Sequence, residues 1–317
     1  EQQWVFTGIT RAVIPSLLRD FSAPVILDYQ TTDQELLFLM QHDNNGFNRW
    51  LSAQTLFERM LLTMMKAENS ADMLTSIDLH GLLNALQGFL PQLAQQDPAL
   101  AAKLLTLPSE NYLAEKTAVI NPSVIHQARV SLQQAIAHAL NGFFAEQYAH
   151  NQSDHGGYIY DSVAIATRSW RELCLHYLLV AVDNQSAQAL ATQQYQQAQH
   201  MTDRLTALRG LVYSNAAQAV DCLADFYQHF QQEALVVDSW FAVQATNPKA
   251  TINDIDALCQ HPAFSLTNPN RLRSVLAQFA NANPVQFHQA DGSGYRFIAE
   301  KIAELDKKIS RYKTLLD

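Results

Sequence analysis

Two arginines near the start of a predicted helix are the residues in this sequence best suited to bind an anion. Arg271 and Arg273 lie in the stretch TNPNRLRS (267–274), where Asn268 can cap a helix and Pro269 suits its first turn. The amino end of a helix carries partial positive charge and attracts anions. A guanidinium there can pair with a carboxylate through parallel hydrogen bonds. Arg273 and Arg271 are therefore the candidate substrate-binding residues.

The two arginines are expected to point in different directions. The buried stripe of this helix is predicted to consist of Leu272, Val275, Leu276 and Phe279. Residues two positions apart on an α-helix are about 200° apart around its axis, so Arg271 and Arg273 flank the stripe. At most one of them should face a given cavity. Arg273 either lines a cavity or pairs with a nearby Asp or Glu, whereas for Arg271 the ion pair is the favoured alternative.

The motifs of common enzymes are absent from this sequence. None of its eleven histidines is followed by another at the fourth position, and no H-E-x-x-H helix motif occurs. The glycine patterns of nucleophile elbows, P-loops and dinucleotide sites are missing as well. His150 and His155 flank the polar loop HNQSDH, which is more simply explained as solvated. We expect no catalytic residue, no metal site and no cofactor in this chain.

The bulk composition excludes several classes of partner. The 317 residues carry a formal net charge of -9, whereas binders of nucleic acid or anionic membranes need a basic surface. No run of about 18 apolar residues could span a bilayer. The three cysteines form no C-x-x-C motif, which fits a reducing compartment. We therefore expect a cytoplasmic location, with neither nucleic acid nor membrane as a partner.

The first thirty residues differ in pattern from the rest. The runs WVFTGI and PVILDY are rich in β-branched and aromatic residues, as strands are. Two or three strands do not make a stable sheet alone. We expect a short N-terminal β stub that belongs to a sheet completed by other parts of a protein.

From Asp33 onward the apolar residues recur at helical spacing. Helices are predicted near 45–68, 72–90, 97–106, 121–149, 159–181, 199–213, 215–230, 232–246, 268–280 and 294–316. Many helices joined by short loops bury their apolar faces as stacked antiparallel pairs. The predicted fold class is mostly α, an irregular superhelical array of antiparallel helix pairs after the β stub.

Several stretches together resemble the C-terminal part of bacterial aminopeptidase N, a gluzincin zinc metallopeptidase family. They include SLLRDFSAPVILDY (16–29), FLMQHDNNGFNRWLSAQTL (38–56), DPALAAKLLTLPSE (97–110), MTDRLTALRGL (201–211), VVDSWFAVQATNP (236–248) and SLTNPNRLRSVLAQFANANPVQFHQADGSGYRF (265–297). The blocks keep the family's order across nearly the whole chain, and the last is the most specific. The tail SRYKTLLD (310–317) is not part of the resemblance.

The resemblance implies a domain layout and a task. Residues 1–30 would be the last strands of a β-sandwich domain, and residues 31–317 a C-terminal α-helical superhelical domain. The zinc ligands and catalytic residues of the family belong to a domain that this sequence does not contain. The chain would then be a non-catalytic portion that caps the active-site chamber and limits peptide access. Its partners would be the zinc-peptidase domain of the same polypeptide and peptide substrates, with zinc in the parent enzyme.

A second interpretation remains open at this point. The chain could be a free-standing helical-array scaffold that binds other proteins through a concave face. The strand-like stub separates the two interpretations, because an independent scaffold has no need of unpaired strands.

Overall fold

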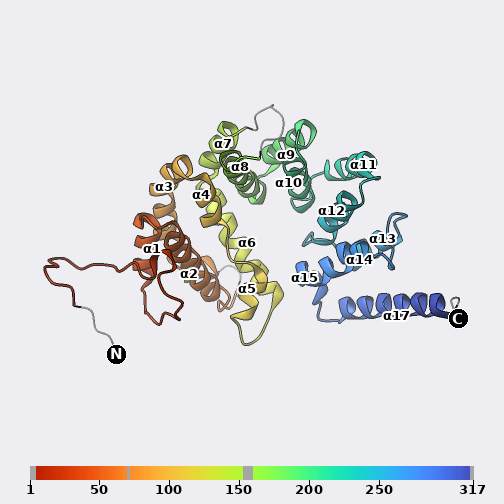
Figure 1. Cartoon of the computed structure of the whole chain (residues 1–317), viewed down its shortest axis with the longest axis horizontal. Helices are drawn as coiled ribbons and strands as arrows, with labels where there is room; N and C mark the ends of the chain where they lie inside the picture. Colours follow the sequence, from red (N-terminus) through yellow and green to blue (C-terminus); the bar gives the residue numbers. More distant parts are fainter. Residues whose placement is uncertain (1–4, 70–71, 153–159, 315–317) are drawn as a thin grey trace. The chain divides into compact units, whose positions relative to one another are not determined.

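The chain is mostly helical. The computed structural model describes residues 5–69, 72–152 and 160–314, and within these ranges it contains no strand (Figure 1). Two compact units divide the chain, Glu1–Leu113 and Ala114–Asp317. The predicted mostly α class is confirmed.

Unit 1 consists of helices that are consecutive in the sequence and are joined by short connections. It contains α1 (Asp33–His42), α2 (Gly46–Met64), α3 (Leu79–Gln96), α4 (Pro98–Leu105) and the short 3-10 helices η1 (Arg19–Phe21) and η3 (Leu74–Ser76), with α5 (Glu110–Glu115) at its end. Helix α2 packs against both α1 and α4. Its core includes the fully buried side chains of Phe57, Leu61 and Leu86.

Helix α3 extends beyond its predicted end. The sequence predicts that the helix stops before Pro91, yet it continues to Gln96 with the proline inside it. Proline removes one hydrogen bond and crowds the preceding turn. Burial of Leu90 and Leu93 on the helix face outweighs this cost, because both side chains lie in the core of unit 1.

Unit 2 is a two-layer array of helices. It contains α6 (Pro122–Ala139), α7 (Asn141–His150), α8 (Ser162–Val180), α9 (Gln185–Gln197), α10 (Met201–Tyr213), α11 (Ala219–Phe230), α12 (Ala234–Ala245) and α13 (Ile252–Gln260). The even-numbered helices α6, α8, α10 and α12 contact one another in a row, and α7, α9 and α11 pack against that row. The predicted helix 121–149 is in fact two helices, because the chain leaves helical geometry at Leu140, just before Asn141 and Gly142.

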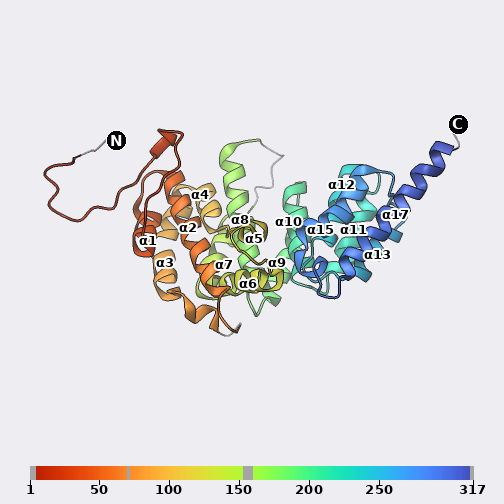
Figure 2. The same cartoon turned by 90° about the horizontal axis from the view of Figure 1, so that it is seen from below.

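The last elements of unit 2 begin with a single interrupted helix. It consists of α14 (Pro269–Leu272), the π-helix η4 (Arg273–Ala277) and α15 (Gln278–Ala282), and is followed by α16 (Pro284–Phe287) and α17 (Ser293–Thr314). Helix α12 packs against η4, and α16 contacts α6. Helix α17 contacts α13 and α16, and its C-terminal end extends beyond the other helices of this unit (Figure 2).

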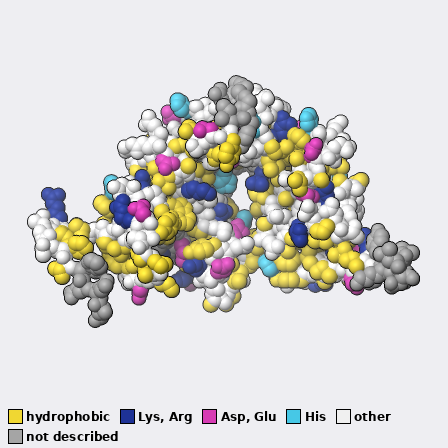
Figure 3. Space-filling view, in the orientation of Figure 1, with side chains coloured by type: hydrophobic (Ala, Val, Ile, Leu, Met, Phe, Trp, Pro, Cys, Tyr) yellow, Lys and Arg dark blue, Asp and Glu magenta, His cyan; other side chains and the backbone are white. Residues whose placement is uncertain are grey.

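The predicted N-terminal strands are not formed in the described residues 5–30. Apart from η1 this segment has no regular structure, and apolar side chains such as Phe6 and Ile26 are exposed. Hydrophobic side chains are visible on the surface at the N-terminal end of the molecule (Figure 3). The physical reason is that a strand needs a neighbouring strand to bond its backbone, and the described chain supplies none. The assignment of residues 1–30 to a sandwich domain stays a prediction.

Among the described residues, no helix combines the length and the apolar character needed to cross a bilayer.

Candidate functional site

The helix that carries the two candidate arginines starts as its sequence predicts. The side-chain oxygen of Asn268 accepts hydrogen bonds from the N–H groups of Asn270 (3.1 Å) and Arg271 (3.3 Å). Pro269 occupies the first turn, where its missing N–H costs nothing. Of the predicted stripe, Val275, Leu276 and Phe279 are buried. The cap and the stripe together set the direction of each arginine.

Arg271 points into unit 2. Only 9% of its side chain is exposed, and its Nη1 lies 2.9 Å from Oδ1 of Asp238 on α12. The guanidinium also lies over the ring of Phe241, 5.3 Å from the ring centre. A buried cation of this kind needs both a counter-charge and a polarisable neighbour. Arg271 therefore has the ion pair that the sequence analysis favoured for it.

Arg273 points the other way. Its side chain is exposed, and it makes no hydrogen bond or ion pair with any described residue. One arginine is thus buried and one is exposed, as the angle between them predicts. The exposed guanidinium sits within the first turns of a capped helix, so two sources of positive charge coincide. This position suits a carboxylate from outside the unit.

The π turn begins at Arg273 itself. In a π-helix the N–H groups bond carbonyls five residues earlier, and here the N–H of Gln278 donates to the carbonyl of Arg273. The buried hydroxyl of Ser274 donates to the carbonyl of Arg271 at 2.9 Å. Single π turns are rare in proteins, and those that occur are often found at functional sites. Sequence periodicity gave no sign of this one.

Aromatic rings surround His261 beside the buried arginine. The rings of Tyr227, Trp240 and Phe241 lie with their centres 4.7, 5.0 and 5.6 Å from the imidazole. Burial lowers the pKa of His261 below its ordinary value, and the charge of Arg271 lowers it further. The neutral imidazole is therefore favoured in the folded chain.

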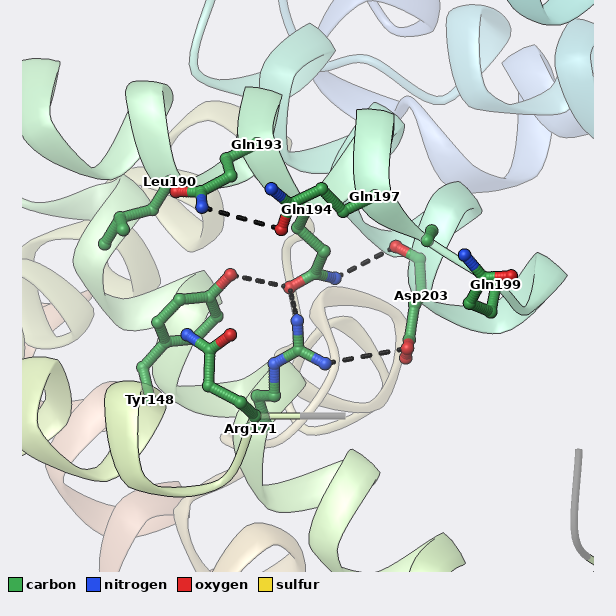
Figure 4. Close-up of a pocket in the computed structure, with 10 residues that line it drawn as sticks. Tyr148, Arg171, Leu190, Gln193, Gln194, Gln197, Gln199 and Asp203 are labelled. Atoms are coloured by element: carbon green, nitrogen blue, oxygen red, sulfur yellow. Dashed lines mark hydrogen bonds and ion pairs between the residues drawn. The ribbon is translucent and has the colours of Figure 1, made fainter. Parts of the chain in front are cut away.

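A second buried guanidinium was not anticipated from the sequence. Arg171 on α8 donates from Nη2 to Oε1 of Gln194 at 2.9 Å, and its Nη1 lies 3.5 Å from Oδ2 of Asp203 on α10 (Figure 4). Gln194 also accepts a hydrogen bond from the hydroxyl of Tyr148 and donates to the carbonyl of Asp203, each at 2.9 Å. These contacts tie helices α7, α8, α9 and α10 together.

The pocket beside Arg171 is too small for a peptide. Its volume is about 30 Å³, which holds about one water molecule. Its wall includes Gln193, Gln197 and Gln199 from the glutamine-rich stretch 185–200 (Figure 4). Burial raises the pKa of Tyr148, a further sign of a closed polar interior. We interpret this pocket as part of the packing of unit 2.

The described residues offer no ligand set for a metal. No group of three His, Cys, Asp or Glu side chains converges within them. Of the two histidines that flank the polar loop, His155 lies outside the described residues. The part of the chain that the structure describes therefore does not fit a zinc site of the kind that peptidases use.

Comparison with known proteins places this chain in a family. The family described as "Domain of unknown function (DUF3458_C) ARM repeats" matches residues 33–310. The aminopeptidase N of Escherichia coli (strain K12) is 36% identical over 97% of this chain and 35% of its own length. That of Haemophilus influenzae is 38% identical over 97% of this chain and 34% of its own.

A solved structure shares the fold. The aminopeptidase A of Legionella pneumophila, in complex with aspartic acid, matches 95% of this chain and 35% of its own with a TM-score of 0.80 and 29% identity. The chain thus spans about a third of the length of the relatives it matches, and its resemblance to the C-terminal part of aminopeptidase N is confirmed. Because the family match covers most of its residues, this chain belongs to the ARM-repeat domains described as DUF3458_C.

Proposed function

We propose that this chain is the non-catalytic C-terminal portion of a zinc-dependent aminopeptidase that removes N-terminal residues from peptides. One observation carries the proposal: 97% of the chain matches about a third of aminopeptidase N, while its described residues bring no metal ligands together. The zinc, which would activate a water for attack on the first peptide bond, then belongs to the rest of the polypeptide. This portion caps the active-site chamber and limits which peptides enter.

The N-terminal segment supports a partner within the same polypeptide. Its uncovered apolar side chains, among them Val5, Phe6, Val25 and Ile26, are suited to a β-sheet that the described residues do not supply. We assign residues 1–30 to the end of a β-sandwich domain and residues 31–317 to the helical domain. The same uncovered segment disfavours a free-standing scaffold. The proposed location is the cytoplasm, without nucleic acid or membrane partners.

Within this function, Arg273 is proposed to line the chamber and to bind carboxylate groups of peptides. Its exposure, its position in a capped helix and its lack of an acidic partner in the described residues support this role. Arg271, paired with Asp238, supports the helix. Contact between Arg271 and substrate stays a prediction that the ion pair makes less favourable.

The first experiment uses the chain alone. The purified 317 residues should bind no stoichiometric zinc and should not hydrolyse an amino-acid anilide. Zinc content is measured by elemental analysis and hydrolysis by release of the aniline. Zinc bound at one equivalent together with hydrolysis would refute the proposal.

The second experiment uses the longer protein from which such a chain derives. Arg273→Ala should raise KM for peptides while zinc content stays unchanged, because a carboxylate contact is lost without any change at the metal. Lys307→Ala, an exposed residue of α17 with the same loss of charge, is the matched control. Unchanged kinetics of Arg273→Ala on both acidic and neutral peptides would contradict a role in the chamber.

A further inference from the structure

The segment that precedes α1 is held in an unusual backbone conformation. Leu18, Asp20 and Phe21 have positive φ angles of 51°, 54° and 55°. None of them is glycine, and side chains with a Cβ rarely adopt this left-handed region. Such strain persists only where surrounding contacts impose it, and it is concentrated at positions with a function. The contacts that impose it can be identified.

A buried carboxylate forms the centre of these contacts. Asp43, in the loop between α1 and α2, has only 1% of its side chain exposed. Its Oδ2 accepts a hydrogen bond from the hydroxyl of Ser16 at 2.5 Å, and its Oδ1 lies 3.7 Å from Nη1 of Arg19. Arg19 also donates to the side-chain oxygen of Asn44. Two residues of the segment are thereby attached to one loop.

Asn45 of this loop and two residues of the first turn of α2, Phe47 and Asn48, hold the segment at further points. The buried amide of Asn48 donates to the hydroxyl of Ser16 at 2.9 Å and to the carbonyl of Leu17 at 2.8 Å. Asn45 donates to the carboxylate of Asp20 at 2.8 Å. The ring of Phe21 packs on that of Phe47, with centres 4.6 Å apart. Residues 43–48, which are the loop 43–45 and the first turn of α2, thus contact five of the six residues 16–21.

The contacts end abruptly on either side. Arg11 and Val13 before the segment, and Val25 and Ile26 after it, are exposed. None of these four makes a hydrogen bond or ion pair with the described residues from 33 to 113, whereas residues 16, 17, 19 and 20 do. The helices of unit 1 therefore grip the N-terminal segment at one short stretch. A grip made of several directional hydrogen bonds fixes an angle, whereas apolar contacts alone would allow sliding.

We propose that residues 16–21 and residues 43–48 form a rigid elbow that sets the direction in which the strand-forming segment leaves the helical unit. Given the proposed function, the elbow would fix the helical domain against the sandwich domain that the segment enters. The backbone strain of Leu18, Asp20 and Phe21 is then the cost of that fixed direction. Ser16 is the most informative residue, since its hydroxyl bonds both Asp43 and Asn48.

The test is cleavage of the chain by trypsin under native conditions. Arg19 lies within the elbow and Arg11 in the exposed segment before it, so one chain contains both a protected and an unprotected site. Ser16→Ala and Asp43→Asn should raise the rate of cleavage after Arg19 by about tenfold, because the hydrogen bonds that hold it closed are lost. Cleavage after Arg11 should not change.

Matched controls separate the elbow from general loosening. Ser22→Ala and Asp28→Asn make the same chemical changes at exposed positions of the same segment and should leave both rates unchanged. Because Ser16 lies outside the helices, Ser16→Ala remains informative even if Asp43→Asn does not fold. An unchanged rate after Arg19 in Ser16→Ala, or an equal rise at Arg11, would overturn the proposal. The measurement needs no peptidase activity, so it can fail or succeed independently of the proposed function.

Discussion

Two buried arginine–aspartate pairs in unit 2 use the same residue types in different surroundings. Arg171 and Asp203 are both almost fully buried, and the side-chain amide of Gln194 hydrogen-bonds to both residues. Arg271 is equally buried, but Asp238 keeps 17% of its side chain exposed. Each guanidinium lies over an aromatic ring, Tyr148 for Arg171 and Phe241 for Arg271. The neighbours of each pair, more than the pair itself, therefore determine how much stability is lost when one partner is removed.

The largest effect is expected at the more enclosed pair. Asp203→Ala leaves the guanidinium of Arg171 buried without its main counter-charge, so the free energy of unfolding should fall by about 3–5 kcal/mol. Urea unfolding followed by circular dichroism measures the loss.

A double variant sharpens this prediction. Arg171→Met combined with Asp203→Leu removes both charges and should recover most of the stability, because an apolar pair needs no hydrogen bonds. If Asp203→Ala cost less than about 1 kcal/mol, the enclosed pair would not differ from an exposed one.

A smaller loss is expected at the second pair. Arg271→Ala should lower the free energy of unfolding by about 2 kcal/mol, since water reaches part of Asp238 and screens its charge. The measurement is the free energy of unfolding of Arg271→Ala and Asp203→Ala, determined by urea unfolding under the same conditions. A loss as large as that of Asp203→Ala would show that the exposure of Asp238 does not matter.

The aromatic surroundings of the second pair predict a dependence on pH. The folded state lowers the pKa of His261 below its usual value of 6.5, so the unfolded chain binds the extra proton more readily. The stability from the neutral imidazole is complete above about pH 6.5 and is lost as pH falls towards the lowered pKa. Wild type should therefore lose more stability than His261→Gln between about pH 7 and pH 5. Parallel losses in the two proteins would contradict this assignment.

The smallest effect is expected at the exposed arginine. Arg273→Ala should change the free energy of unfolding by no more than about 0.5 kcal/mol, because its side chain contacts no described partner. The same urea unfolding measurement on Arg273→Ala and Arg271→Ala compares two arginines of one helix. A loss equal to that of Arg271→Ala would mean that Arg273 supports the fold instead of facing a ligand.

The sequence allowed the local features of this site to be predicted. Asn268 and Pro269 mark the helix start, and helical spacing separates the buried Arg271 from the exposed Arg273. The partner Asp238 could not be predicted, since it lies 33 positions earlier and meets Arg271 only through packing. The π turn was hidden because one extra residue barely alters the apolar spacing of a short helix.

Two other features show where pattern reading fails for physical reasons. Arg171 lies on α8, and its partners Gln194 and Asp203 follow it by 23 and 32 positions, so the sequence gives no sign of the buried network that packing forms. The pattern of residues 1–30 predicts strands, but none forms in the described residues 5–30, because pairing needs a second strand.

The π turn has a consequence for how this helix tolerates changes of length. Its two ends each keep a buried side chain, Arg271 in α14 and Phe279 in α15, and the wide turn between them takes up the surplus backbone. Removal of one amino acid between Arg273 and Ala277 would convert the π turn into an ordinary α-helical turn, and the buried side chains at both ends of the helix would keep their positions. Variation in chain length by a single residue is therefore least costly here, and because the removed position follows Arg273, the guanidinium would keep its direction relative to α14.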